Sequence, residues 1–202
     1  MKKILTISAA SVAAALALAG CSGGTGGSMP GMSHDSSAMA SSSAPVAAGD
    51  HSSDDTMFAE MMIPHHAQAV EMSDMLLKKQ NIPAAVTAMA TKIKAAQAPE
   101  IEKMTAWLKS WNETATMSGS QSMTGATGMM GADDMKKLDA AQGTEAAKLF
   151  LTQMIAHHQG AVAMAKTETG AGKKADAVAL AKSIVASQEA EIQDMKNQLA
   201  SL

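Results

Sequence analysis

Four long segments of the chain carry apolar residues at the spacing of one face of a helix. In the first segment, Phe58, Met62, Ala69 and Leu76 recur every three or four positions, and the segment ends before the turn-forming Asn81. The same periodicity continues in three further segments, at about residues 83–112, 144–169 and 176–200. Nowhere do apolar and polar residues alternate as in a strand, so the sequence predicts an all-α fold.

The pattern of the first two segments returns in the last two. Residues 58–72 match residues 150–164, which lie 92 positions later, and both stretches contain a pair of adjacent histidines. The sequence around Glu100 returns around Glu191, at an offset of 91 positions. A repeat of this length is typical of a duplicated supersecondary unit and not of a solenoid.

Two repeated helical hairpins joined by a crossover predict a four-helix bundle. The halves of this bundle are expected at about residues 56–112 and 144–202, so the folded domain covers residues 56–202. The crossover is rich in Gly, Ser, Thr and Met, and we expect a short helix at its end, at about residues 133–141.

The first 20 residues predict a secretory signal peptide of the lipoprotein type. Two lysines precede an apolar run, which ends in Leu-Ala-Gly directly before Cys21, the acceptor of a diacylglyceryl group in a bacterial lipobox. A transmembrane anchor is the alternative, but the run is shorter than the roughly 20 residues that a span needs. Residues 21–55 are dominated by Gly, Ser, Ala, Met and His, which predicts a flexible tether. We therefore expect a protein of the cell envelope, held by its lipid on the extracytoplasmic side of a bacterial membrane.

Composition narrows the possible functions. All 16 basic residues are lysines and the formal net charge is −3, which disfavours nucleic-acid binding because that function relies on arginine and a basic face. A single cysteine excludes a disulfide framework and a cysteine-based zinc module. The chain has 19 methionines but only two phenylalanines, two tryptophans and no tyrosine, so the choice of sulfur in the core is unusual.

The repeat places histidines and carboxylates on the faces that point into the bundle. On a helical wheel, His65 and His157 lie close to the centre of the apolar stripe, and Glu100 and Glu191 lie on the centre lines of their own helices. The second histidine of each pair lies about 80° from the centre of the apolar stripe. We expect these two residues at the edge of the stripe: His66 and His158.

A buried carboxylate needs a compensating partner. One explanation is an internal hydrogen-bond network in which His65 and His157 pair with the glutamates and the amides of Gln97 and Gln188 complete the network. The other is a metal site, because imidazole, carboxylate and thioether groups converge twice. The candidate metal ligands are His65, His66, His157, His158, Met62, Met72, Met154, Met164, Glu100 and Glu191.

The softness of the donors indicates which metal would bind. Thioether together with imidazole favours Cu(I), with Ag(I) as its analogue, whereas Cu(II) and Zn would use histidine and carboxylate. A di-iron site of the ferritin type requires Glu-x-x-His, which the sequence lacks, while a haem held by histidine and methionine stays possible. Auxiliary soft donors lie in the tether and the crossover: Met29, Met32, His34, Met129 and Met130.

The histidine motifs resemble domain of unknown function family 305. The resemblance is carried by Met-Ile-Pro-His-His at residues 62–66, by Met-Ile-Ala-His-His-Gln-Gly at residues 154–160, and by Gly-Met-Met at residues 128–130. It implies an exported bacterial protein with a ferritin-like four-helix bundle, and a link to copper or silver, since a periplasmic copper-binding protein belongs to this family.

The sequence thus favours an envelope lipoprotein that binds Cu(I) or Ag(I) and buffers the ion, provides resistance to it, or exchanges it with a metal-donor or metal-acceptor protein. Two alternatives stay open. One is a bundle oxidase that uses a bound metal, and the other is a structural or interaction module whose His-Glu network belongs only to the core.

Overall fold

The structure, a computed structural model, describes residues 51–113 and 128–202. Within these residues it contains five α-helices and no β-strand. The helices are α1 Ser53–Leu77, α2 Ala84–Ser110, α3 Ala132–Ala140, α4 Gly143–Ala171 and α5 Ala175–Ala200. The all-α fold, the four long helices and the short helix in the crossover are therefore confirmed. The predicted signal peptide, the lipidation site Cys21 and the donors of the tether lie outside the described residues.

Local hydrogen bonds fix the start of α1 and the turn that follows it. Ser52 and Asp55 form a capping box, in which the Ser52 hydroxyl accepts the Asp55 N–H at 3.3 Å. The Asp55 carboxylate also accepts the backbone N–H groups of Lys173 and Lys174, at 3.0 and 2.9 Å, so the start of α1 is tied to the turn between α4 and α5. At the other end of α1, Asn81 adopts a left-handed backbone (φ 58°) that turns the chain toward α2.

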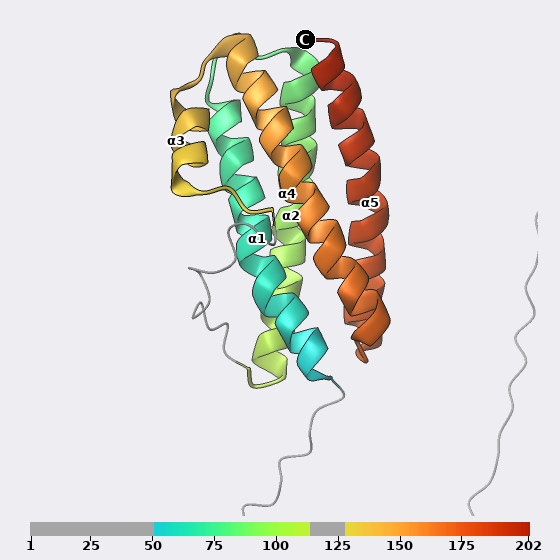
Figure 1. Ribbon diagram of the computed structural model, residues 1–202. Helices are drawn as coiled ribbons and strands as arrows, with labels where there is room; N and C mark the ends of the chain where they lie inside the picture. The colour runs from blue at the N-terminus through green and yellow to red at the C-terminus, as the bar shows by residue number, and fades with distance from the viewer. Residues whose placement is uncertain (1–50, 114–127) are drawn as a thin grey trace, which may run out of the picture. The chain divides into compact units, whose positions relative to one another are not determined.

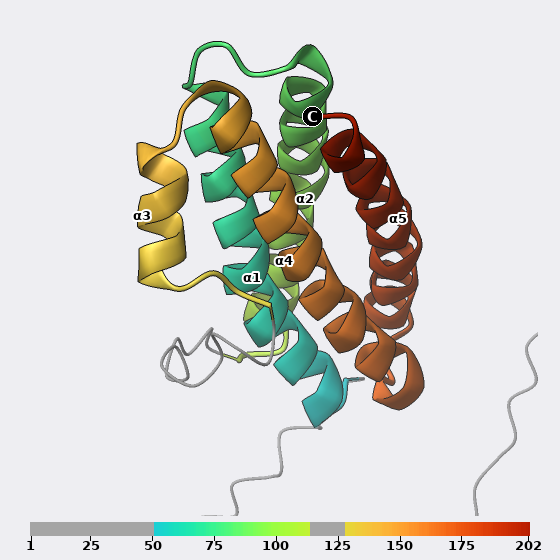
Figure 2. The same ribbon diagram turned by 45° about the horizontal axis from the view of Figure 1, so that its top comes forward.

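The helices form two antiparallel hairpins that meet along one pair of helices. α1 packs against α2, and α4 packs against α5 (Figure 1). The hairpins contact each other mainly through α1 and α4, while α2 and α5 lie on the outer side. α3 lies against α1 and α4, toward the end of the bundle that holds the turn between α1 and α2 (Figure 2). None of the described helices is long and apolar enough to cross a membrane.

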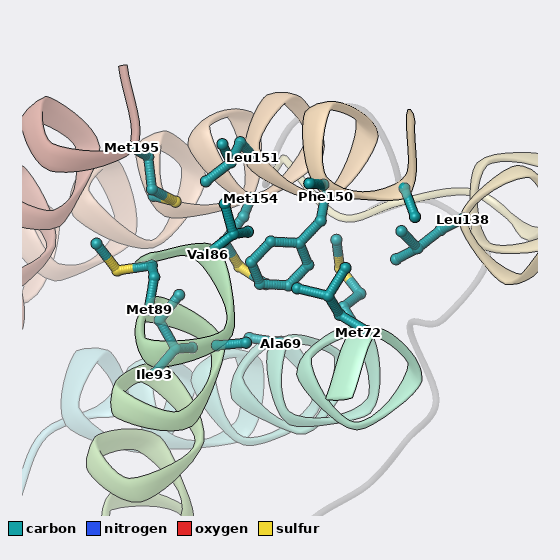
Figure 3. Close-up of a cluster of buried hydrophobic side chains, with 14 of the residues drawn as sticks. Ala69, Met72, Val86, Met89, Ile93, Leu138, Phe150, Leu151, Met154 and Met195 are labelled. Carbon is teal, nitrogen blue, oxygen red and sulfur yellow. The ribbon is translucent and has the colours of Figure 1, made fainter. Parts of the chain in front are cut away.

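Apolar side chains fill two separate clusters in the bundle. One cluster contains Met72 and Phe150 and extends to Leu138 of α3 (Figure 3). The other contains Phe58 and Leu108. Along α1 and α4 the two clusters change over at the histidine pairs, so a polar layer separates them. Fully buried methionines contribute to both clusters: Met62, Met72, Met104, Met154 and Met195.

The segment that leads into α3 is held closely against α1 and α4. The side-chain amide of Gln68 binds the backbone of Met130 twice, accepting its N–H at 2.7 Å and donating to its carbonyl at 2.9 Å. Gly128 has a φ of 73°, and a Cβ at this position would lie 2.3 Å from the carbonyl oxygen of Ala156. Only glycine allows this approach, which brings the crossover next to the histidine-bearing turns.

Candidate functional site

A layer of four histidines from α1 and α4 crosses the middle of the bundle. His65 and His157 lie side by side, with ring centroids 3.7 Å apart and 35° between the ring planes. His66 lies 6.5 Å from His65, and His158 lies 6.4 Å from His157. All four side chains are completely buried.

The outer two histidines are bonded to the glutamates of the neighbouring helices. His66 Nε2 lies 2.7 Å from Glu100 Oε2, and His158 Nε2 lies 2.9 Å from Glu191 Oε2. The prediction that His66 and His158 lie at the edge of the stripe is therefore wrong. α1 packs against both α2 and α4, so a residue about 100° from His65 faces α2 instead of solvent.

The two His-Glu pairs differ in their surroundings. The Glu191 carboxylate also pairs with Lys92 of α2, at 3.4 Å, and its side chain is 5% exposed. The Glu100 side chain is 21% exposed. The position equivalent to Lys92 in the second hairpin is Ser183, which has no charge to offer. The pair in the first hairpin is therefore the more open one.

Electrostatics at the layer favour a neutral His157 and an ionised Glu191. Burial and the neighbouring imidazoles, beginning with His65, hold the pKa of His157 well below its ordinary value of 6.5. Burial raises the pKa of Glu191, but the hydrogen bond and charge of His158 and the charge of Lys92 outweigh burial, so the pKa lies below 4.5. A neutral imidazole retains a lone pair for a metal ion.

Several buried polar atoms around the histidines lack hydrogen bonds. Within the described residues no partner is present for both ring nitrogens of His157, both amide atoms of Gln97, Oε1 of Gln188, or Nδ1 of His66 and His158. Nearly all buried polar atoms in proteins are hydrogen-bonded, so a cluster of this kind requires an explanation. A bound ion or water molecule in the layer would provide one.

Only some of the predicted methionine ligands lie next to this layer. Met62 and Met154 are fully buried and precede His65 and His157 by one helical turn. Met72 and Met164 follow the same histidines by two turns, about 10 Å along the helix axis. At this distance from the histidines, Met72 packs in an apolar cluster and Met164 lines a pocket.

The auxiliary donors of the crossover are close to the α1–α4 face. Met129 and Met130 are half-buried, and the backbone of Met130 is held by Gln68, one turn after His65. The donors of the tether, Met29, Met32 and His34, lie outside the described residues.

The donor set fits a soft ion better than a hard one. In the part of the chain that the structure describes, no group of three or more His, Cys, Asp or Glu side chains is arranged to hold a metal. Zinc needs about four nitrogen, oxygen or sulfur ligands, and Cu(II) prefers nitrogen and oxygen. Thioether groups select Cu(I), and Met62 and Met154 provide them beside the histidines. The imidazole and thioether groups present therefore fit Cu(I) or Ag(I).

Sequence reasoning missed three residues of this region. Met104 and Met195 are fully buried one turn beyond Glu100 and Glu191. The two methionines are 91 positions apart, like the two glutamates, and this repeat could have indicated them from the sequence. Lys92 had no such signal, because only the packing of α2 beside α5 brings its long side chain to Glu191.

Comparisons with known proteins give one family and several similar structures. The family model for "Domain of unknown function (DUF305)" matches residues 55–199. A DUF305 fragment from Deinococcus radiodurans shares 28% identity, with a TM-score of 0.70 over 75% of this chain and 98% of that chain. A DUF305 protein from Streptomyces coelicolor, described as secreted, shares 34% identity, with a TM-score of 0.68 over 73% of this chain and 91% of that chain.

CopM is a further structural relative. CopM in its Cu(I)-bound form shares 31% identity, with a TM-score of 0.60 over 73% of this chain and 96% of that chain. CopM has also been solved in Cu(II)-bound, Ag-bound and apo forms. No curated protein matches the sequence.

Proposed function

The chain belongs to the DUF305 family, and from this premise we propose that it binds Cu(I) or Ag(I) at the four-histidine layer. The observation that carries the proposal is the cluster of buried nitrogen and oxygen atoms without hydrogen-bond partners among the described residues. A protein gains nothing from such atoms in its empty state, because each costs about 1–3 kcal/mol. An ion in the layer would use the ring nitrogens directly.

His65 and His157 are the proposed imidazole ligands, with Met62 and Met154 as thioether ligands from the preceding turns. His66 and His158 are held by Glu100 and Glu191, which orient the outer rings and offset positive charge. Support also comes from CopM, a relative at about 30% identity that has been solved with Cu(I), Cu(II) and Ag bound. A bound ion would supply a soft Lewis-acid centre, which these nitrogen and sulfur ligands would hold.

Binding is a better description of the activity than catalysis. All four histidines are 0% exposed, so a substrate would reach them only after the helices separate. We place the protein outside the cytoplasm, anchored by a lipid on Cys21, where it buffers the ion or passes it to a partner protein. The secreted relative from Streptomyces coelicolor supports the extracytoplasmic location.

A competition titration with a Cu(I) chelator tests the proposal. In the double variant His65→Phe/His157→Phe, slightly larger rings without nitrogens replace the imidazoles, so no cavity opens in the core. We expect affinity for the tightest ion to fall at least tenfold. The matched control is His51→Phe, because His51 stacks on Trp111 at 4.6 Å, outside the layer. This control should bind as tightly as the parent.

Two outcomes would contradict the assignment. If His65→Phe/His157→Phe and His66→Phe/His158→Phe both bind the ion as tightly as the parent, the histidine layer is only a structural network. If His66→Phe/His158→Phe loses affinity while His65→Phe/His157→Phe does not, the ion lies at the His-Glu pairs. Far-UV circular dichroism confirms that each variant keeps its helices before the titration is interpreted.

A further inference from the structure

A methionine-lined pocket lies away from the histidine layer, between the start of α1 and the end of α4. Its volume is about 140 Å³. Met57 and Met61 line it from successive turns of α1, and Met164 lines it from α4. Among the described residues, Met57 is the only large apolar side chain that is mostly exposed, at 55%. Figures 1 and 2 show that this end of α1 lies at the opposite end of the bundle from α3.

The repeat shows that Met57 and Met61 are not needed for the bundle itself, whereas Met164 aligns with the buried core residue Met72. The positions equivalent to Met57 and Met61 in the second hairpin are Leu149 and Gln153. Leu149 packs on an apolar cluster, and Gln153 donates to the backbone carbonyl of Asp134 in α3, at 3.0 Å. Leu149 and Gln153 therefore lie at the end of the bundle where α3 packs. Met57 and Met61 lie at the other end, where their thioethers line an open pocket.

A buried carboxyl group lines the same pocket. Glu168 of α4 is 1% exposed, and its carboxyl group shares a hydrogen bond with another acid, Asp55, so one of the two groups must carry a proton. The equivalent residue in the first hairpin is the fully buried Leu76, so packing does not require a carboxyl group here. Asp54 lines the pocket as well. A cation bound here would favour the form in which Glu168 has lost its proton.

We propose that Met57, Met61 and Met164 form a second site for Cu(I) or Ag(I), independent of the histidine layer, in which Glu168 releases its proton when the ion binds and so supplies a compensating charge. Thioether groups are soft donors that select Cu(I) over zinc, calcium or magnesium. Methionine side chains are flexible, so three of them can close around an ion without moving the helices. The pocket is open to solvent at Met57, which suits a site that takes up the ion first.

The helix dipoles do not oppose this site. The start of α1 carries a partial positive charge, but Asp54 and Asp55 occupy its first turn and offset that charge. Met164 lies in the last two turns of α4, whose end carries a partial negative charge. A plain apolar surface that binds no ion is the alternative that the experiment must exclude.

Methyl NMR of the full chain labelled with ¹³C at the methionine methyl groups distinguishes these possibilities, with Ag(I) as the probe. We expect the methyl signals of Met57, Met61 and Met164 to shift together and to saturate during the titration. In the variant Met57→Leu/Met61→Leu/Met164→Leu, one equivalent of bound Ag(I) should be lost. The matched control Met75→Leu/Met89→Leu/Met135→Leu changes three methionines outside the pocket and should keep all bound Ag(I).

The same titration in the His65→Phe/His157→Phe background separates this site from the histidine layer. If the three methyl signals still shift there, the second site stands whether or not the layer binds an ion. If they shift only when the histidines are intact, the sites are not independent and the proposal is wrong. The proposal is equally wrong if Ag(I) leaves the three signals unchanged, or if the triple leucine variant binds as much Ag(I) as the control.

Discussion

Gln97 offers a direct test of the idea that the histidine layer is destabilising when empty. Its side chain is 3% exposed, and within the described residues neither its amide nitrogen nor its amide oxygen has a hydrogen-bond partner. Leucine has a similar volume and no polar atom, so Gln97→Leu removes the unsatisfied groups without opening a cavity. This substitution should therefore make the metal-free protein more stable.

The size of the effect follows from the two orphaned atoms. An unsatisfied buried polar group costs about 1–3 kcal/mol. We expect Gln97→Leu to raise the free energy of unfolding by about 2 kcal/mol, because water that enters the layer recovers part of that cost. For a slope of about 2 kcal/mol per molar urea, the unfolding midpoint should rise by about 1 M. The assay is urea unfolding followed by circular dichroism, with a chelator present to keep the protein metal-free.

A second buried glutamine provides the control. Gln153 is also buried and its amide oxygen lacks a partner among the described residues, but its amide nitrogen donates to the Asp134 carbonyl in α3 at 3.0 Å. Gln153→Leu breaks this bond and should lower the free energy of unfolding by about 1 kcal/mol. If Gln97→Leu is as destabilising as Gln153→Leu, then Gln97 is fully hydrogen-bonded in solution and the reasoning about the layer is refuted.

Three further predictions concern other parts of the chain. Burial and the neighbouring Asp55 raise the pKa of Glu168 from 4.5 to about 8, so the folded protein binds more protons than the unfolded one between these values. As pH rises from about 4.5 to 8, the free energy of unfolding of the wild type should therefore fall relative to that of Glu168→Gln. The expected fall is about 2 kcal/mol, because the open pocket screens part of the pKa shift. If urea unfolding gives the wild type and Glu168→Gln the same dependence of this free energy on pH, the prediction is wrong. Gly128→Ala should lower the thermal midpoint and reduce the free energy of unfolding by roughly 2 kcal/mol or more. The added Cβ would meet the Ala156 carbonyl, and the backbone at this position is left-handed. An unchanged midpoint would show that this segment is not held against α4. Cys21→Ser should abolish lipidation, and a wild-type protein that partitions into the aqueous phase without an acyl mass would contradict the predicted anchor.

The helices were predictable because their signals are local. The three-to-four-residue spacing, the acidic start of α1 and the turn at Asn81 all act within a few residues, and the structure has helices where these signals predict them. The burial of His65 and His157 was predictable for the same reason, since both lie on the central line of an apolar stripe.

The partners within the site were not predictable from a single helix. A helical wheel gives the direction of a side chain but not the neighbour that it meets, so the bonds of His66 to Glu100 and of His158 to Glu191 were assigned to the wrong histidines. The contact of Lys92 with Glu191 joins α2 to α5, and no local signal reports it.

X-ray absorption spectroscopy of the protein loaded with one equivalent of Cu(I) tests the central claim most directly. The account predicts imidazole nitrogen in the first shell together with sulfur, and the loss of the imidazole scattering in His65→Phe/His157→Phe. A first shell made of sulfur alone would move the tightest site away from the histidine layer. A protein that retains no stoichiometric copper after desalting would contradict the claim altogether.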